Sequence, residues 1–312
     1  ANNVSKTYGS ANPDITGYTI SGYKNGEETA TNIVTGSPVA STLVTNNTAV
    51  GTYPITLVPG TLSAANYAFQ MVEGALTVNR ALITVTALNT SRLYGGVNPS
   101  FFVSYDGFVL GETRESGAIS GTPLVTTQAI NTTKVGVYDI VTSIGTLTST
   151  NYNFALINGK LTIDKAPLKI TAENKSRIYG AANPLFTAKY EGFVNGEDLV
   201  FSKITGQPNL STLATSSSDA GSYSISISNG DLFSENYAFS FVPGMLTIDK
   251  ALMRVYAENQ SKLYGEAMPR LTYRFDGFMN NETITSGTVS GAPVLTDRKS
   301  TRLNSSHVKR SR

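Results

Sequence analysis

Residues 136–172 read GVYDIVTSIGTLTSTNYNFALINGKLTIDKAPLKITA. Three runs in this stretch alternate apolar with polar or small residues: Tyr138–Ile140, Tyr152–Leu156 and Leu161–Ile163. A period of two places the apolar side chains on one face of a β-strand, so each run is a predicted strand. Gly145 and Gly159 fall between the runs, where turns favour positive φ. The stretch therefore predicts β-structure with tight turns.

The same pattern recurs along the chain with a step of 85 residues. Tyr-Gly pairs begin at Tyr8, Tyr94, Tyr179 and Tyr264, and Asn-Tyr pairs begin at Asn66, Asn151 and Asn236. The matching alternating runs are residues 53–57, 67–71 and 76–78, then 223–227, 237–241 and 246–248. The first Tyr-Gly interval is one residue longer, which predicts a loop insertion between Pro13 and Tyr23. Repetition at a fixed step is typical of a tandem array.

We predict a mainly β fold, organised as a tandem array of small β-rich modules in an elongated rod. The predicted modules are residues 1–79, which lack their first strand, 80–164, 165–249, and 250–296, which are truncated. No window with a helical period exceeds about ten residues, so helix is limited to a short turn in each module. The boundaries NRALITVTA, DKAPLKITA and DKALMRVYA contain no Gly/Ser spacer, which limits bending. Each module would add roughly 30 Å to the rod.

Composition excludes several classes of function. The chain has no cysteine and no tryptophan, and its single histidine is His307. Without that histidine, Ser-His-Asp catalysis and imidazole metal sites are excluded, and no phosphate-binding loop motif is present. No apolar run approaches the roughly 20 residues of a membrane span. We therefore predict that the chain is not an enzyme, binds no cofactor and does not span a membrane.

The last residues, 297–312, differ from the rest of the chain. They carry six Lys/Arg and one Asp, and residues 1–296 then hold 18 basic and 21 acidic residues. That mildly acidic balance gives no support for nucleic-acid binding. The 85-residue pattern stops at Asp297, and DRKSTRLNSSH resembles the translation of a sequencing adapter. We predict that this tail is not native to the protein.

Taken together, the repeated motifs carry a family resemblance. One motif reads KTYGSANP, RLYGGVNP, RIYGAANP and KLYGEAMP, and another reads YDGFVLGE, YEGFVNGE and FDGFMNNE. This pattern resembles the MBG-type (YGX) repeat of bacterial surface proteins and filamentous-haemagglutinin-like adhesins, over residues 1–296. Met268 and the module 1 segment SGYKNGEE depart from it. The resemblance implies extracellular β-grasp-like modules, with an Ig-like sandwich as the alternative, and no catalytic residues.

Acidic residues recur in the second motif as pairs six positions apart. These pairs are Asp106 with Glu112, Glu191 with Glu197, and Asp276 with Glu282. Paired carboxylates suit a glycosidase-like site or a calcium site. Ser21 replaces the first acid in module 1, no Asp-rich calcium loop appears, and an active site is seldom copied into every module. We favour acids that flank turns and bond local backbone N–H groups, with calcium as the alternative.

The tyrosines of the Tyr-Gly motif, Tyr8, Tyr94, Tyr179 and Tyr264, allow two interpretations. An exposed row of tyrosines would stack on sugars. Alternatively, each tyrosine packs at a module junction while Gly and Asn-Pro shape a tight loop. Packing is favoured, since every module needs the same corner. An Asn-x-Ser sequence, nominally a glycosylation acceptor, also recurs at Asn3, Asn89, Asn174 and Asn259, where we favour local turn bonding.

The repeats and the resemblance together favour a fragment of an extracellular bacterial adhesin-type surface protein. Its modules would form a stalk and bind an extracellular glycan or protein, besides contacting adjacent repeats of the same chain. Two alternatives stay open at this point. One is a stalk or accessory segment of a large secreted glycan-active enzyme, and the other is an inert cell-wall or S-layer spacer.

Overall fold

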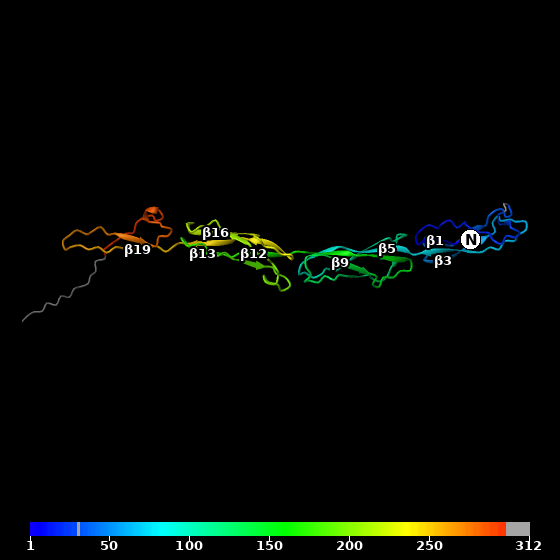
Figure 1. Ribbon diagram of the computed structural model, residues 1–312, viewed down its shortest axis with the longest axis horizontal. Helices are drawn as coiled ribbons and strands as arrows, with labels where there is room; N and C mark the ends of the chain where they lie inside the picture. The colour runs from blue at the N-terminus through cyan, green and yellow to red at the C-terminus, as the bar shows by residue number, and fades with distance from the viewer. Residues whose placement is uncertain (30–31, 298–312) are drawn as a thin grey trace, which may run out of the picture. The chain divides into compact units, whose positions relative to one another are not determined.

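The computed structural model describes residues 1–29 and 32–297 and is built of short β-strands (Figure 1). Within these residues the helical segments are two single 3-10 turns, η1 (Glu27–Thr29) and η2 (Ile284–Ser286). The chain divides into two compact units, Ala1–Ala166 and Pro167–Arg312. The prediction of a mainly β protein is confirmed. The predicted tail lies outside the described residues, apart from Asp297, and the rod shape stays a prediction.

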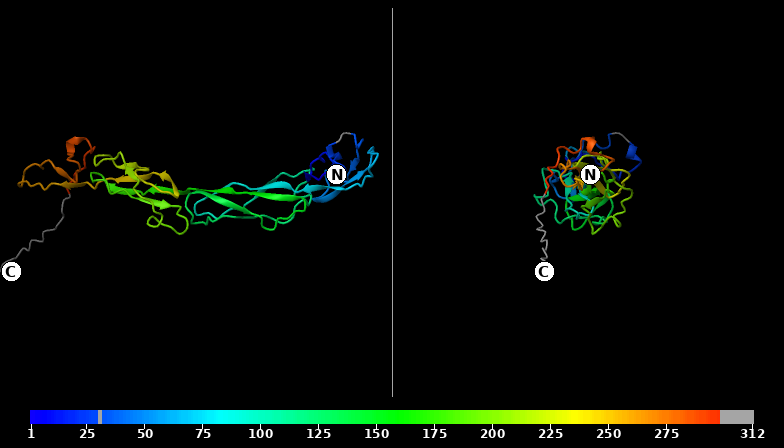
Figure 2. Two further views of the ribbon diagram at one scale, coloured as in Figure 1. Left: turned by 45° about the vertical axis from the view of Figure 1, so that its right-hand side comes forward. Right: turned by 90° about the vertical axis from the view of Figure 1, so that its left-hand side faces the viewer.

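Residues 80–164 form a complete module with two sheets. The three-stranded sheet has the order β10 (Tyr152–Ile157), β5 (Ala81–Ala87), β7 (Val103–Asp106). The four-stranded sheet has the order β6 (Thr90–Leu93), β11 (Gly159–Asp164), β9 (Gly136–Ser143), β8 (Leu124–Thr126). In Figure 2 the strands of this module, coloured cyan to green, run along its length.

The first and last segments of this module lie side by side and run in the same direction. β5 pairs in parallel with β10, with Ala81 opposite Tyr152, and β6 pairs in parallel with β11, with Thr90 opposite Leu161. The remaining pairs, β5–β7, β11–β9 and β9–β8, are antiparallel. Both β5–β6 and β10–β11 therefore pass from one sheet into the other while they stay beside each other.

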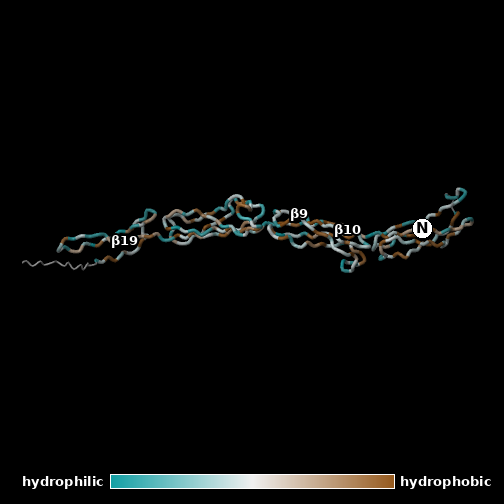
Figure 3. Tube along the Cα trace, turned by 90° about the horizontal axis from the view of Figure 1, so that it is seen from below, coloured by the Kyte–Doolittle hydropathy of each residue, from teal (hydrophilic) through white to brown (hydrophobic). Residues whose placement is uncertain are grey.

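Burial alternates along these strands as a period of two requires. In β5 the side chains of Ile83 and Val85 are fully buried, whereas Leu82 between its buried neighbours is 56% exposed. In β11, Leu161 and Ile163 are buried in the same way. Figure 3 shows the resulting alternation of hydrophobic and hydrophilic colour along the tube. Each such buried aliphatic side chain contributes roughly 1.5–3 kcal/mol, so this inward face supplies most of the packing energy.

Module 1 forms one sheet and lacks part of the pattern. Its strands have the order β1 (Val4–Thr7), β4 (Gly74–Asn79), β3 (Gly51–Val58), β2 (Val39–Ser41). The predicted strand at Tyr67–Met71 is wrong, because these residues are irregular. The equivalent strand β10 is paired by β5, and no described segment of module 1 occupies the position of β5 beside Tyr67–Met71.

The strands of residues 165–249 repeat the arrangement of the complete module. One sheet has the order β14 (Ala188–Glu191), β12 (Ala166–Ala172), β17 (Tyr237–Val242). The other has the order β13 (Lys175–Ile178), β18 (Gly244–Asp249), β16 (Gly221–Ser228), β15 (Asn209–Ser211). Residues 250–297 add the pair β19 (Arg254–Ala257) and β20 (Tyr273–Asp276). The repeat in sequence is therefore a repeat in topology.

The two sheets correct the β-grasp-like expectation. A β-grasp module packs a helix against a single sheet, whereas the described residues contain no α-helix and each complete module has two sheets. The segment between β7 and β8 is rich in Gly, Ser and Thr and contains Pro123, which explains why it forms turns instead of a helix. The two-sheet alternative is closer to the observed arrangement.

Candidate functional site at the module junction

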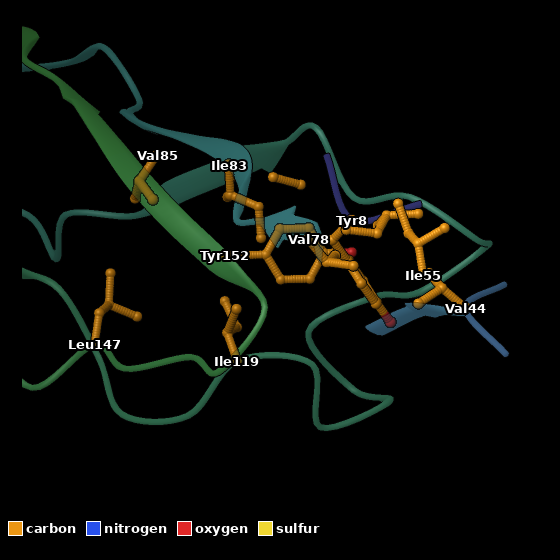
Figure 4. Close-up of a cluster of buried hydrophobic side chains, with 11 residues drawn as sticks. Tyr8, Val44, Ile55, Val78, Ile83, Val85, Ile119, Leu147 and Tyr152 are labelled. Carbon is orange, nitrogen blue, oxygen red and sulfur yellow. The ribbon is translucent and has the colours of Figure 1, made fainter. Parts of the chain in front are cut away.

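Tyr8 lies at the end of β1 and packs against the following module. Its ring centroid is 5.7 Å from that of Tyr152 with an interplanar angle of 83°, and Phe108 approaches Tyr152 at the same centroid distance. The exposed fractions of Tyr8 and Tyr152 are 4% and 1%. Figure 4 shows the two rings next to each other inside a hydrophobic cluster. Tyr8 therefore belongs to a packed junction and not to an exposed row.

Glu112 joins the two modules by accepting hydrogen bonds from both tyrosines. The Tyr8 hydroxyl donates to Glu112 Oε1 at 2.8 Å, and the Tyr152 hydroxyl donates to Glu112 Oε2. The backbone N–H of Val109 donates to the Tyr152 hydroxyl at 3.1 Å, which orients that hydroxyl. A further bond across the junction runs from the Val50 N–H to Asn151 Oδ1, at 3.1 Å. One carboxylate thus connects a tyrosine of each module.

The protonation states of these groups suit this arrangement. Burial raises the pKa of Tyr152 to about 12, and its hydrogen bond to Glu112 acts in the same direction. Burial also raises the pKa of Tyr8, again with a contribution from the bond to Glu112. Both hydroxyls therefore stay protonated at neutral pH and donate to the carboxylate.

The Tyr-Gly sequence brings this turn close to the next module. Gly9 has φ +86°, and a Cβ on it would lie 2.4 Å from Cγ2 of Val109. That distance is below any ordinary contact, so a side chain at Gly9 would push the loop of Val109 away. Glycine at this position is explained both by its backbone conformation and by the closeness of the neighbouring loop.

One hydrophobic cluster extends across this junction. From module 1 it includes Val44, Ile55, Leu76 and Val78, and from residues 80–164 it includes Ile83, Val85, Ile119 and Leu147. In Figure 4, Tyr8 and Tyr152 lie between Val44 and Ile55 on one side and Val85 and Leu147 on the other. The modules therefore share a core at their boundary, and the boundary is not a flexible linker.

The same contact recurs inside the second unit. The Tyr179 hydroxyl donates to Glu282 Oε1 at 2.6 Å, and a Cβ on Gly180 would lie 2.5 Å from the Cβ of Met279. Asn280 Nδ2 also donates to the Ser216 carbonyl at 3.2 Å. Two junctions in separate units thus use the same tyrosine, glycine and glutamate positions.

The tyrosine of the Asn-Tyr motif reaches the glutamate of its own module in three places. The pairs are Tyr67 with Glu27, Tyr152 with Glu112, and Tyr237 with Glu197, the last at 2.7 Å. This finding corrects the expectation that these glutamates bond local backbone N–H groups. Their carboxylates accept tyrosine hydroxyls that are distant in sequence.

The first acid of each pair has a different environment. Asp106 ends β7, and Glu191 ends β14, where it forms ion pairs with Lys169 at 2.6 Å and Lys189 at 2.7 Å. The two lysines lower the pKa of Glu191 to about 2. Glu191 therefore faces lysines while Glu197 faces Tyr237, so the structure does not bring these two acids to a shared ligand. Of the remaining tyrosines, Tyr94 is buried at 4% exposure and Tyr264 is fully exposed.

A buried basic residue lies two positions before the first three Tyr-Gly tyrosines, at Lys6, Arg92 and Arg177, and escaped the sequence prediction. Arg92 is 9% exposed and donates through Nε to Asn98 Oδ1 at 2.7 Å and through Nη2 to the Ile130 carbonyl at 2.6 Å. Asn98 Nδ2 donates in turn to the Ala129 carbonyl at 2.7 Å. Burial lowers the pKa of Arg92, as it lowers the pKa of Lys6 at the equivalent place. The signal was present in the recurrent [KR]-x-Tyr-Gly-x-x-Asn spacing.

A polar groove of about 570 Å³ lies beside the first junction. Its lining residues include Arg80, Glu112, Ser116, Ser120 and Thr148.

Among residues 1–29 and 32–297, no three acidic or histidine side chains converge on a point where a metal ion would be bound. The same residues include no helix of the length and hydrophobicity needed to cross a membrane.

These features define a class of tandem β-repeat protein, in which the tyrosine turn of one module is bonded to a glutamate of the next. The chain belongs to the MBG domain family of the YGX type, whose model matches residues 1–77, 83–162, 168–247 and 253–302. The resemblance drawn from the motifs is thereby confirmed, and the fourth match extends beyond Thr296. No curated protein matches the chain. Among solved structures, the I9–I11 tandem from titin is similar, with 14% identity and a TM-score of 0.18, over 68% of this chain and 82% of that one.

Proposed function

We propose that the chain is a stalk segment of an extracellular bacterial adhesin-type surface protein, in which the modules act as a stiff spacer. The observation that carries this proposal is the repeated Tyr–Gly–Glu junction. Contacts between domains of one chain are by default mobile unless they are large and hydrophobic. Here Tyr8 is 4% exposed at the junction, and one hydrophobic cluster crosses the boundary. Such a boundary favours one fixed arrangement of the two neighbours, as a spacer requires.

Small-angle X-ray scattering of the full chain tests the spacer. We expect rod-like scattering whose maximum dimension grows by roughly 30 Å per module. The variant Glu112→Ala/Glu282→Ala, which removes the acceptor at both described junctions, should show a broader distribution of dimensions, while Glu115→Ala, an exposed acid nearby, should not. A compact or strongly flexible wild-type chain would contradict the spacer.

The surface location needs its own test. Antibodies raised against the full chain should label intact cells of the source organism, and mild protease treatment of those cells should remove the labelling. Labelling that appears after cell lysis alone would refute the extracellular assignment while leaving the spacer result untouched.

A glycan-binding role for the modules is a second candidate, and the groove beside the first junction favours it. Ser116, Ser120 and Thr148 line the same groove as Arg80, a set of hydroxyl groups and a guanidinium that suits polar ligands such as sugars. Screening the full chain on a glycan array tests this role. Binding that Arg80→Ala and Ser120→Ala weaken supports it, and uniform absence of binding favours an inert spacer.

A further inference from the structure

The strands by which the chain enters and leaves residues 80–164 are bonded directly to each other. The chain enters through β5 and β6 and leaves through β10 and β11. Because both pairs of strands are parallel, the entry lies at one end of the paired path and the exit at the other. Tension applied at these two points pulls the paired segments past each other, along the strands.

The bonding between the two segments reaches both ends of the module. At the entry, the Ala81 N–H donates to the Asn151 carbonyl at 3.0 Å, and at the exit the Tyr94 N–H donates to the Asp164 carbonyl at 2.8 Å. The β5–β10 and β6–β11 ladders lie between these two bonds with the same offset. The path from entry to exit is thus paired on both sides of the step from β5 to β6.

Asn89 bridges the one interruption in this path. The ladders stop where β5 gives way to β6, and there Asn89 Oδ1 accepts from the backbone N–H of Lys160, on the exit strand, at 2.7 Å. Equivalent bonds join Asn3 Oδ1 to the N–H of Ala75 at 2.9 Å, and Asn174 Oδ1 to the N–H of Met245 at 2.8 Å. The asparagines of the first three Asn-x-Ser sequences therefore bond across the parallel pair and not within their own turns.

We propose that each complete module is a mechanical clamp that resists tension along the chain by shear between its entry and exit strands. Pulling along parallel paired strands loads many backbone hydrogen bonds at once, whereas pulling across them at one end breaks the bonds one after another. The strands β7, β8 and β9 lie outside the tensioned path. This inference goes beyond the spacer, because a spacer needs a fixed angle between modules and no resistance to force. It holds wherever the protein is located.

Single-molecule force spectroscopy on the full chain tests the clamp. Because the chain has no cysteine, two introduced cysteines define the points of pulling. Arg80→Cys with Asp164→Cys loads the entry and exit strands in shear. Arg80→Cys with Thr150→Cys pulls the same two strands apart from the end where Ala81 meets Asn151. All three substituted positions are exposed.

We expect the unfolding force in the shear geometry to be several times that in the unzipping geometry at the same pulling speed. Forced unfolding reports the unfolding rate, so the two geometries compare barriers within one fold. Equal forces would overturn the clamp, and they would leave the scattering and labelling tests of the spacer unaffected.

The asparagine bridge is tested in the same instrument. Asn89→Ala should lower the force in the shear geometry and leave the unzipping force unchanged, since unzipping starts at the opposite end of the ladder. Ser91→Ala, exposed and two residues further along in β6, is the matched control and should change neither force. An unchanged shear force in Asn89→Ala would remove Asn89 from the clamp. If that variant fails to fold, the two geometries in the chain with Asn89 still decide the proposal.

Discussion

Replacing Glu112 by alanine should loosen the junction between the first two modules. The substitution removes the acceptor of two hydroxyl groups, those of Tyr8 and Tyr152, whose side chains are 4% and 1% exposed. A buried donor left without an acceptor costs about 1–3 kcal/mol. Two such donors give an expected loss of about 2–6 kcal/mol. The lower end applies if water reaches the hydroxyls through the adjoining polar groove.

Three further variants separate the contributions to this loss. Glu112→Gln keeps one side-chain acceptor but loses the charge, so its cost should be smaller than that of alanine. Tyr8→Phe removes the Tyr8–Glu112 bond and keeps the Tyr152–Glu112 bond, so it should cost about 1 kcal/mol. Adding Glu112→Ala to a Tyr8→Phe background should cost less than it does alone, because one of the two stranded donors is already gone. Glu115→Ala, an exposed acid in the same loop, is the control.

Hydrogen exchange of the full chain, read by mass spectrometry, measures the effect where it arises. The amides of Tyr8, Val109 and Glu112 are bonded at the junction, so peptides that contain them should exchange faster in Glu112→Ala. Peptides from β16 and β18, in the other unit, should not change. If Glu112→Ala exchanged no faster at the junction than Glu115→Ala, the carboxylate would not hold the two modules together, and the reasoning would be wrong.

Three other changes have definite expected outcomes. Arg92→Ala should destabilise its module by about 3 kcal/mol, because it leaves Asn98 Oδ1 and the Ile130 carbonyl without their charged donor. Arg92→Lys should cost less. Thermal unfolding followed by circular dichroism measures both variants. The pKa of Tyr152 is raised to about 12, above the value of about 10 in an unfolded chain, so its stabilising contribution is complete below pH of about 10. As the pH then rises towards 12, the unfolded state loses its proton first and up to about 3 kcal/mol of stability is lost. Urea denaturation should show this slope in the wild type and a smaller one in Tyr152→Phe, where Tyr8 still contributes. Gly121→Ala should lose several times as much stability as Gly117→Ala in the same thermal assay. Both glycines have φ near +80°, so the backbone strain is similar. A Cβ at Gly121 would lie 1.9 Å from the Thr146 carbonyl oxygen, whereas nothing lies within 4 Å of a Cβ at Gly117.

The local part of the fold was predictable because its signals are local. Alternation in Tyr138–Ile140 and Leu161–Ile163 depends on which face of a strand is buried, and the structure places strands at both segments. Glycine at Gly145 permits the positive φ of the turn between β9 and β10. The same reasoning failed at Tyr67–Met71, since an alternating run becomes a strand only where another strand pairs with it.

The parallel pairing of β5 with β10 was not predictable from these signals. It joins residues 71 positions apart, and no turn sequence specifies it. A hairpin, in contrast, can be predicted from the two central residues of its turn. The partner of Glu112 was equally hidden, because an acid at a loop is as consistent with a local backbone bond as with a distant hydroxyl. The recurrence of the Tyr8 and Glu112 positions indicated that both have a role in the repeat, but it did not indicate that the two side chains bond to each other.

The contacts at the junction explain why the tyrosine and the glutamate both recur. At both described junctions a tyrosine turn of one module meets a glutamate of the following module, and at the first of them that glutamate, Glu112, also accepts its own module's Tyr152. A carboxylate has two oxygens, so the second oxygen is available for a donor from the preceding module. The contact is therefore directional, because the tyrosine belongs to the earlier module and the glutamate to the later one. Tyr8 bonds to Glu112 in this way, and Tyr179 bonds to Glu282. Loss of Glu112 consequently affects the core of its own module and the junction before it, which couples the stability of that module to its attachment.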